Sequence, residues 1–171
     1  MSQEDSSIKI SETNGEISLG GESATETIRI WFDCNCPYCR RHWLDNLDDY
    51  VRRIEAGELR LVMIPVAFLT TYSVEIGSLL FALAPYGAGL YLDVFRDAIF
   101  HGISESEGND EDAVSAKVGE LFKNIIQPYL KENGLPLDDF AKKMAAVQTE
   151  KIKGNTERAF EKGINGVPHI E

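Results

Sequence analysis

Three cysteines lie close together in this chain, as Cys34, Cys36 and Cys39. A framework of structural disulfides spreads an even number of cysteines along a short secreted chain, so this cluster indicates redox chemistry or metal binding instead. The spacing of Cys36 and Cys39 places two thiols on one turn of a helix, where they can reach each other. This pair is therefore the first candidate for chemistry.

The two cysteines lie where a predicted strand gives way to a predicted helix. Thr27–Phe32 is rich in β-branched and aromatic residues, which is typical of a buried strand. Pro37 favours the first turn of a helix, because its missing N–H would be unsatisfied there. A cysteine at a helix N-terminus faces free N–H groups that stabilise a thiolate, and its pKa falls to roughly 3.5–7.5. We therefore expect Cys36 to be an exposed nucleophile and Cys39 the resolving thiol behind it.

Four neighbouring residues are candidates for tuning the thiols. Pro37 and Tyr38 lie between the cysteines. Asp33 is either a buried acid that shuttles protons for Cys39 or a residue that shapes the turn. His42 falls three residues after Cys39, so it either stabilises the thiolate from the same helix face or packs elsewhere.

A metal site is the main alternative chemistry at this cluster. Cys34, Cys36, Cys39 and His42 are all residue types that bind zinc. Pro37, which fixes the helix start, and the lack of a second ligand cluster argue against it. Cys34 itself has three interpretations: a loop thiol without a role, a competitor for Cys36, or a site of intermolecular bridging.

The first third of the chain predicts a hairpin and a βαβ unit. Alternating residues on either side of Asn14-Gly15 indicate the hairpin. Helical spacing from Pro37 to Gly57 and a second strand at Leu59–Val66 complete the unit, whose two strands should be parallel.

The chain is then mainly helical, before a turn and an extended segment over residues 163–170. The predicted helices are Val74–Ala84, Leu90–Phe100, Glu111–Asn133 and Leu137–Gly163. The uncharged run Ile76–Leu92 is broken by Pro85 to Gly89, so it indicates two short core helices rather than a membrane span.

Two motifs resemble the DsbA-type thiol–disulfide oxidoreductases of the thioredoxin superfamily. The first is Ile28–His42, a strand followed by Asp33, Cys-Pro-Tyr-Cys and a helix start. The second is Gly163–Pro168, which is similar to the loop that carries the family's cis-proline. The helical stretch between them matches the domain that this branch inserts into the thioredoxin fold.

The resemblance implies an α/β, thioredoxin-like fold with an inserted helical domain. Residues 1–66 would form the hairpin and βαβ unit, residues 67–162 the inserted domain, and residues 163–171 the returning cis-proline loop. The family's last strands would be missing from this chain. A homo-oligomer is expected if another chain completes the sheet.

The resemblance also implies protein-disulfide oxidoreductase activity without a cofactor. Pro168 would be cis, and the Val167 backbone would bind an extended substrate strand. Protein thiols or disulfides would be the substrates, and a redox partner would recycle the site. The Pro-Tyr dipeptide predicts a weaker oxidant than the Pro-His dipeptide of the strongest family members. A metal-binding domain and a redox-inert peptide-binding module are the alternatives.

Composition narrows the function further. The formal net charge of −11 leaves no basic footprint for nucleic acid. The polar, acidic start has no export signal, so the chain as written is expected in the cytoplasm, or outside it if a leader or anchor has been removed. Net oxidation of substrates requires a location outside the cytoplasm.

Overall fold

A mixed five-stranded sheet forms the centre of the protein. The computed structural model describes residues 7–145 and 148–171. The strand order is β1-β2-β4-β3-β5. The strands are β1 (Ile10–Thr13), β2 (Glu16–Leu19), β3 (Glu26–Asp33), β4 (Leu59–Val66) and β5 (His169–Ile170).

The predicted hairpin and βαβ unit are both present. β1 and β2 are antiparallel around Asn14 and Gly15, whose φ angles of 53° and 85° fit a tight hairpin turn. β3 and β4 are parallel over their whole length and are joined by α2 (Pro37–Glu55). β5 pairs antiparallel with β3 and so returns the end of the chain to the sheet beside the cysteines.

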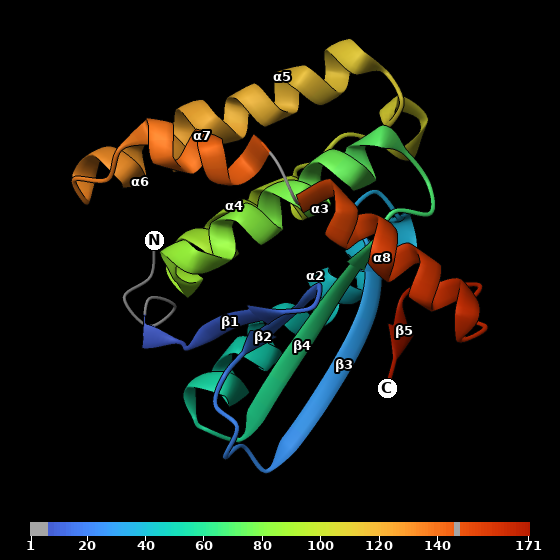
Figure 1. Ribbon diagram of the computed structural model, residues 1–171. Coiled ribbons are helices and arrows are strands. Elements are labelled where there is room, and N and C mark those ends of the chain that lie inside the picture. The colour runs from blue at the N-terminus through green and yellow to red at the C-terminus, as the bar shows by residue number, and fades with distance from the viewer. Residues whose placement is uncertain (1–6, 146–147) are drawn as a thin grey trace.

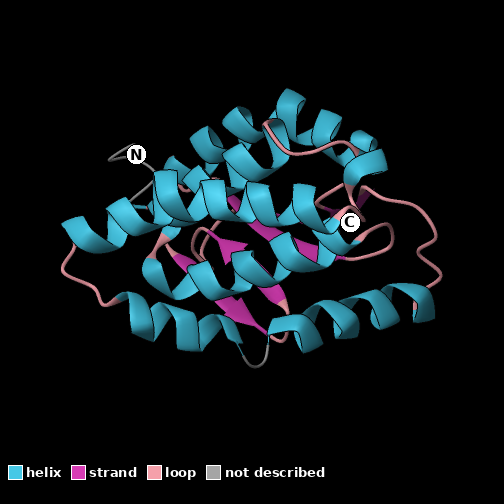
Figure 2. Cartoon of the chain, turned by 90° about the horizontal axis from the view of Figure 1, so that it is seen from above, coloured by secondary structure: helices cyan, strands magenta, loops and turns pink. Residues whose placement is uncertain are grey.

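Helices cover the sheet and build a second block beside it. In Figure 1, α2 lies behind the sheet and α8 in front of it, whereas α3–α7 are stacked above the hairpin. Figure 2 shows helices on both sides of the strands. The remaining helices are α3 (Thr71–Leu83), α4 (Ala88–Phe100), α5 (Glu111–Leu121), α6 (Gln127–Glu132), α7 (Leu137–Ala145) and α8 (Gln148–Glu161), with short 3₁₀ turns at Ala84–Tyr86 and Glu105–Glu107.

Two predicted helices differ from the structure. The segment Leu137–Gly163 forms α7 and α8, which run in different directions (Figure 1), rather than one helix; residues 146–147 lie outside the described part. The segment Glu111–Asn133 is helical, but Phe122–Ile126 widens into a π-helix between α5 and α6. Pro128 accounts for this widening, because it has no N–H to donate to the preceding turn.

The uncharged run Ile76–Leu92 forms parts of α3 and α4, as predicted. Gly87, with φ of 104°, separates the two helices. None of the described helices combines the length and the apolar character needed to cross a membrane.

Aromatic packing fixes the end of β3 against the helices. Trp43 of α2 makes edge contacts with Phe32 of β3 and Phe95 of α4, with ring centroids 5.3 Å and 5.2 Å apart. Phe32 and Phe95 also contact each other, at 5.8 Å. This buried triad anchors α2 directly after the residues of the cysteine cluster. The division into residues 1–66, 67–162 and 163–171 stays a prediction.

Candidate active site

The cysteine cluster lies on the turn that leads from β3 into α2. The Cys36 N–H donates to the Asp33 carbonyl at 3.2 Å, which closes the turn. Cys36 is the N-cap residue of α2, in extended backbone conformation, and Pro37 follows as the first helical residue. The thiol of Cys36 therefore lies at the end of the helix where N–H groups are free.

Cys36 has the environment of a thiolate. Its pKa is lowered from 9.0 to about 6, first by a hydrogen bond from the Cys39 thiol and then by the backbone N–H groups of Cys39 and Tyr38. Burial and the charge of Asp33 oppose this shift. At neutral pH Cys36 is mostly ionised, as the position at a helix N-terminus predicts.

Cys39 has the opposite character. It is 1% exposed, and its pKa is raised because its proton is shared with Cys36 and because it is buried. The Asp33 N–H donates to Cys39 Sγ at 3.4 Å. The structure thus brings together a thiolate and a protonated thiol, and the three cysteines are free.

The Gly163–Pro168 segment lies opposite the pair. The peptide bond between Val167 and Pro168 is cis, as expected. Cys36 Sγ is 3.8 Å from the Val167 carbonyl oxygen. Cys36 is only 7% exposed, so the expectation of an exposed nucleophile is wrong. The cause is that the Val167 backbone lies against its sulfur.

Asp33 is fully engaged as a hydrogen-bond acceptor. Its carboxylate accepts from the backbone N–H of Asn35 and Phe68, both at 2.8 Å, from that of Leu69 at 3.2 Å, and from the Ser73 hydroxyl. Burial nevertheless raises its pKa. These bonds show a residue that shapes the turn and holds the β4–α3 loop. The proton-shuttle role stays a prediction.

The other predicted tuning residues lie in different surroundings. His42 Nε2 is 2.9 Å from the Tyr50 hydroxyl, further along α2, and burial lowers the pKa of this histidine. The structure does not bring His42 to the two sulfurs. Tyr38 is 76% exposed beside the thiols. Pro37 is also exposed.

Cys34 does not join the reactive pair. It is buried, and its pKa is raised well above the ordinary value by burial and by the charge of Asp33. Within the described residues, no group of three His, Cys, Asp or Glu side chains could hold a metal ion. The metal alternative therefore receives no support from the geometry.

Asn35 is a site residue that the sequence reasoning missed. It is 6% exposed, its Nδ2 donates to the Ile103 carbonyl at 3.2 Å, and its Oδ1 accepts from the Thr70 hydroxyl at 2.6 Å. It thereby ties the cysteine turn to the α3 N-terminus and to the α4–α5 loop. Asparagine at a strand-to-helix turn is a signal for such bonding, but its partners are distant in sequence.

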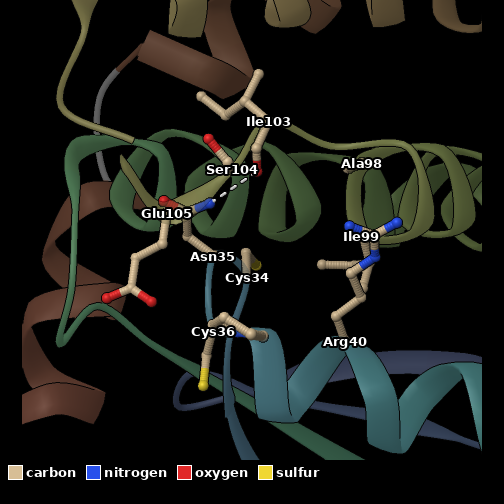
Figure 3. A pocket seen from close by; sticks show the side chains of 10 residues that line it. Cys34, Asn35, Cys36, Arg40, Ala98, Ile99, Ile103, Ser104 and Glu105 are labelled. Atoms are coloured by element: carbon tan, nitrogen blue, oxygen red, sulfur yellow. Dashed lines mark hydrogen bonds between the residues drawn. The ribbon is translucent and has the colours of Figure 1, made fainter. Parts of the chain in front are cut away.

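A cavity of about 210 Å³ adjoins the cysteine turn. Figure 3 shows Arg40 and Ile99 on one side, Ser104 and Glu105 on the other, and Cys36 at the base.

Comparison with solved structures defines the class of fold. A thioredoxin-like oxidoreductase from Silicibacter pomeroyi DSS-3 is 24% identical, with a TM-score of 0.64 over 94% of this chain and 80% of the other. The thiol-disulfide oxidoreductase MdbA from Corynebacterium diphtheriae is 17% identical, with a TM-score of 0.71 over 96% of this chain and 85% of the other. The thiol-disulfide exchange protein alpha-DsbA2 from Wolbachia pipientis is 16% identical, with a TM-score of 0.65 over 90% of this chain and 74% of the other. The fold is thus thioredoxin-like and of the DsbA type.

The sequence itself gives the family. The sequence profile described as thioredoxin matches residues 12–170. The chain therefore belongs to the thioredoxin family. No curated protein sequence matches it.

Proposed function

We propose that this protein is a thiol–disulfide oxidoreductase that exchanges disulfides with protein substrates through Cys36 and Cys39. The observation that carries the proposal is the asymmetry of the pair. Cys36 has a pKa of about 6, whereas that of Cys39 is raised, and Cys36 lies at the N-terminus of α2 against the Val167 backbone. Membership of the thioredoxin family and the DsbA-type fold support the same activity.

Oxidation of a substrate takes two exchange steps. A substrate thiolate attacks Cys36 Sγ of the Cys36–Cys39 disulfide, which forms a mixed disulfide and releases Cys39 as a thiolate that takes up a proton. A second substrate thiolate then attacks the substrate sulfur of the mixed disulfide. The products are a substrate disulfide and the Cys36 thiolate, so two electrons pass from the substrate to the protein pair.

Reduction of a substrate follows the same steps in reverse. The Cys36 thiolate attacks a substrate disulfide, and Cys39 then loses its proton and attacks Cys36 Sγ, which releases the reduced substrate. The low pKa of Cys36 makes it both the ready nucleophile and the better leaving group. The pair carries both electrons itself, so the exchange requires no cofactor.

The residues around the pair have supporting roles in this proposal. In this proposal the Val167 carbonyl beside Cys36 Sγ accepts a backbone N–H from an extended substrate strand, with Pro168 fixing the loop. Pro37 and Tyr38 set the N-terminus of α2, and the backbone N–H of Tyr38 lowers the Cys36 pKa. Asp33 raises it, and His42, which bonds Tyr50 further along α2, has no direct role at the sulfurs in this proposal. A separate redox partner returns the pair to its starting state after each turnover.

Catalysis of insulin reduction, with dithiothreitol as the reductant, tests the proposal. The wild-type chain should accelerate insulin reduction, and Cys36→Ser should lose that acceleration entirely. Cys34→Ala is the matched control, because Cys34 is buried and takes no part in the hydrogen bond between Cys36 and Cys39, and it should retain turnover. Full activity of Cys36→Ser would refute the proposed function.

A further inference from the structure

The cavity beside Cys36 lies between two separate parts of the fold. One wall comes from the start of α2, with Pro37 and Arg40. The other comes from the end of α4 and the loop after it, with Ala98, Ile99 and Ile103. It adjoins Cys36 on the side of the cysteine turn where the end of α4 lies (Figure 3).

Hydrogen bonds hold the two walls in a fixed relation. Arg40 Nη2 donates to the Phe100 carbonyl at 2.8 Å, which links α2 to the end of α4. Asn35 Nδ2 donates to the Ile103 carbonyl at 3.2 Å, which links the cysteine turn to the α4–α5 loop. The cavity is therefore preformed, so an occupant does not have to order its walls.

The volume selects a side chain as the occupant. At about 210 Å³ the cavity is smaller than the ~300–1,000 Å³ of pockets for drug-sized ligands. It is nevertheless roughly seven times the ~30 Å³ that one water occupies. A cavity of this size at the rim of a protein-binding site fits one side chain of a bound segment.

The lining selects an aliphatic side chain. Ala98 and Ile99 are buried, and Ile103 is half-buried. Arg40 and Glu105, which are exposed and opposite in charge, also line it, together with the uncharged polar residues Asn35 and Ser104. Opposite charges leave no net field that favours an acidic or a basic side chain, whereas apolar surface favours burial of CH₂ and CH₃ groups.

Disulfide geometry determines which substrate residue reaches the cavity. In a mixed disulfide the Cα of the substrate cysteine lies about 4.4–6.8 Å from the Cα of Cys36. The next Cα of the substrate is about 3.8 Å further along. Cys36 is among the residues that line the cavity, but its Sγ points away from Ile99 and Ile103 (Figure 3). The residue next to the substrate cysteine, rather than the cysteine itself, is therefore the one within reach of the cavity.

We propose that this cavity is a specificity subsite for an aliphatic side chain next to the reactive cysteine of a protein substrate. The proposal rests on the proposed function and adds selectivity to it. Val167 offers a backbone carbonyl, which any substrate strand satisfies. The cavity on the other side of the pair distinguishes one side chain from another.

Oxidation of synthetic peptides by the full chain tests the subsite. The peptides carry two cysteines and differ only in the residue next to the reactive cysteine, which is leucine, phenylalanine, glycine, aspartate or lysine. The chain is first oxidised, and peptide oxidation is followed by acid quenching and mass spectrometry. Each rate is divided by the rate of the same peptide with oxidised glutathione, which removes differences in intrinsic thiol reactivity.

The leucine peptide should react about tenfold faster than the glycine peptide, as one well-placed apolar group allows, and aspartate and lysine should give no gain. Ile103→Phe, which fills the cavity, should bring leucine and glycine to parity. Ile103→Ala, which widens it, should shift the preference towards phenylalanine. Leu44→Phe adds the same ring on the exposed face of α2 and should keep the leucine preference.

Three outcomes would overturn the subsite. The first is equal rates for leucine and glycine in the wild-type chain, which leaves the oxidoreductase function intact. The second is a leucine preference that persists in folded Ile103→Phe and in Ile103→Ala. The third is no oxidation of any peptide, which removes the proposed function and the subsite with it.

Discussion

Replacing Cys39 by alanine should raise the pKa of Cys36. The hydrogen bond from the Cys39 thiol is the largest cause of the low Cys36 pKa, and alanine removes it. The backbone N–H groups of residue 39 and Tyr38 remain. Cys39→Ser keeps a hydroxyl donor, so the Cys36 pKa should rise in the order wild type, Cys39→Ser, Cys39→Ala.

The low pKa sets the scale of this effect on thiolate reactivity. A thiol with a pKa of about 6 is about 90% ionised at pH 7, whereas one at 9.0 is about 1% ionised. Complete loss of the shift would therefore slow thiolate alkylation at pH 7 about 90-fold. The N–H groups of α2 that lower the pKa and the burial and Asp33 charge that raise it all remain in the variant, so the loss should be of this order.

Iodoacetamide alkylation as a function of pH measures the shift. The series is made in a Cys34→Ala background, so that Cys36 is the only thiol common to all variants, and modified Cys36 is quantified by peptide mapping. Circular dichroism verifies that each variant is folded. A Cys36 pKa that stays near 6 in Cys39→Ala would contradict the reasoning, because the helix N–H groups alone would then account for the thiolate.

Three further predictions concern the surroundings of the pair. Asp33→Asn should destabilise the fold by about 1–3 kcal/mol in urea unfolding, since the partly buried N–H groups of Phe68 and Leu69 lose their acceptor. It should nevertheless lower the Cys36 pKa in alkylation, since a negative charge is removed; a higher Cys36 pKa would refute this. Asn35→Ala should cost about 1–3 kcal/mol in the same unfolding assay, because the half-buried Ile103 carbonyl and Thr70 hydroxyl lose their partner; an unchanged midpoint would refute it. The Tm of the reduced protein should rise relative to the oxidised protein as the pH rises from about 6 to 9.0. The Cys36 pKa is lower folded than unfolded, so its stabilisation is complete above the unfolded value and is lost as the pH falls through about 6. The raised pKa of Cys39 acts in the opposite direction only where unfolded thiols ionise, around 9.0 and above; a constant Tm difference between pH 6 and 9 would refute this prediction.

Local patterns were sufficient to predict most of the elements. The strand Leu59–Val66 has its predicted bounds, and α2 begins at Pro37 as expected. The separation of α7 from α8 could not be predicted, because Ala145 to Gln148 contains no proline or glycine. Contacts far away in sequence hold α8 in place: Asn155 Nδ2 donates to the Gly15 and Pro65 carbonyls at 2.8 Å and 2.9 Å.

The site also combines features with a local cause, which the sequence predicts, and features set by contacts distant in sequence, which it does not. The spacing of Cys36 and Cys39 at a helix start predicted the asymmetric pair, because the cause is local. The proximity of Val167 came from the family resemblance, since 131 positions separate it from Cys36. The turn position of Asn35 favours side-chain bonding, but its partners Thr70 and Ile103 lie 35 and 68 positions away and have no local pattern. The near burial of Cys36 was missed for the same reason.

The most direct test of the account is a titration of the full chain against mixtures of reduced and oxidised glutathione, with mass-spectrometric mapping of the disulfides. The account predicts a reversible two-electron transition in which Cys36 and Cys39 pair with each other and Cys34 stays reduced. Failure of that pair to form, or a disulfide that includes Cys34, would contradict it.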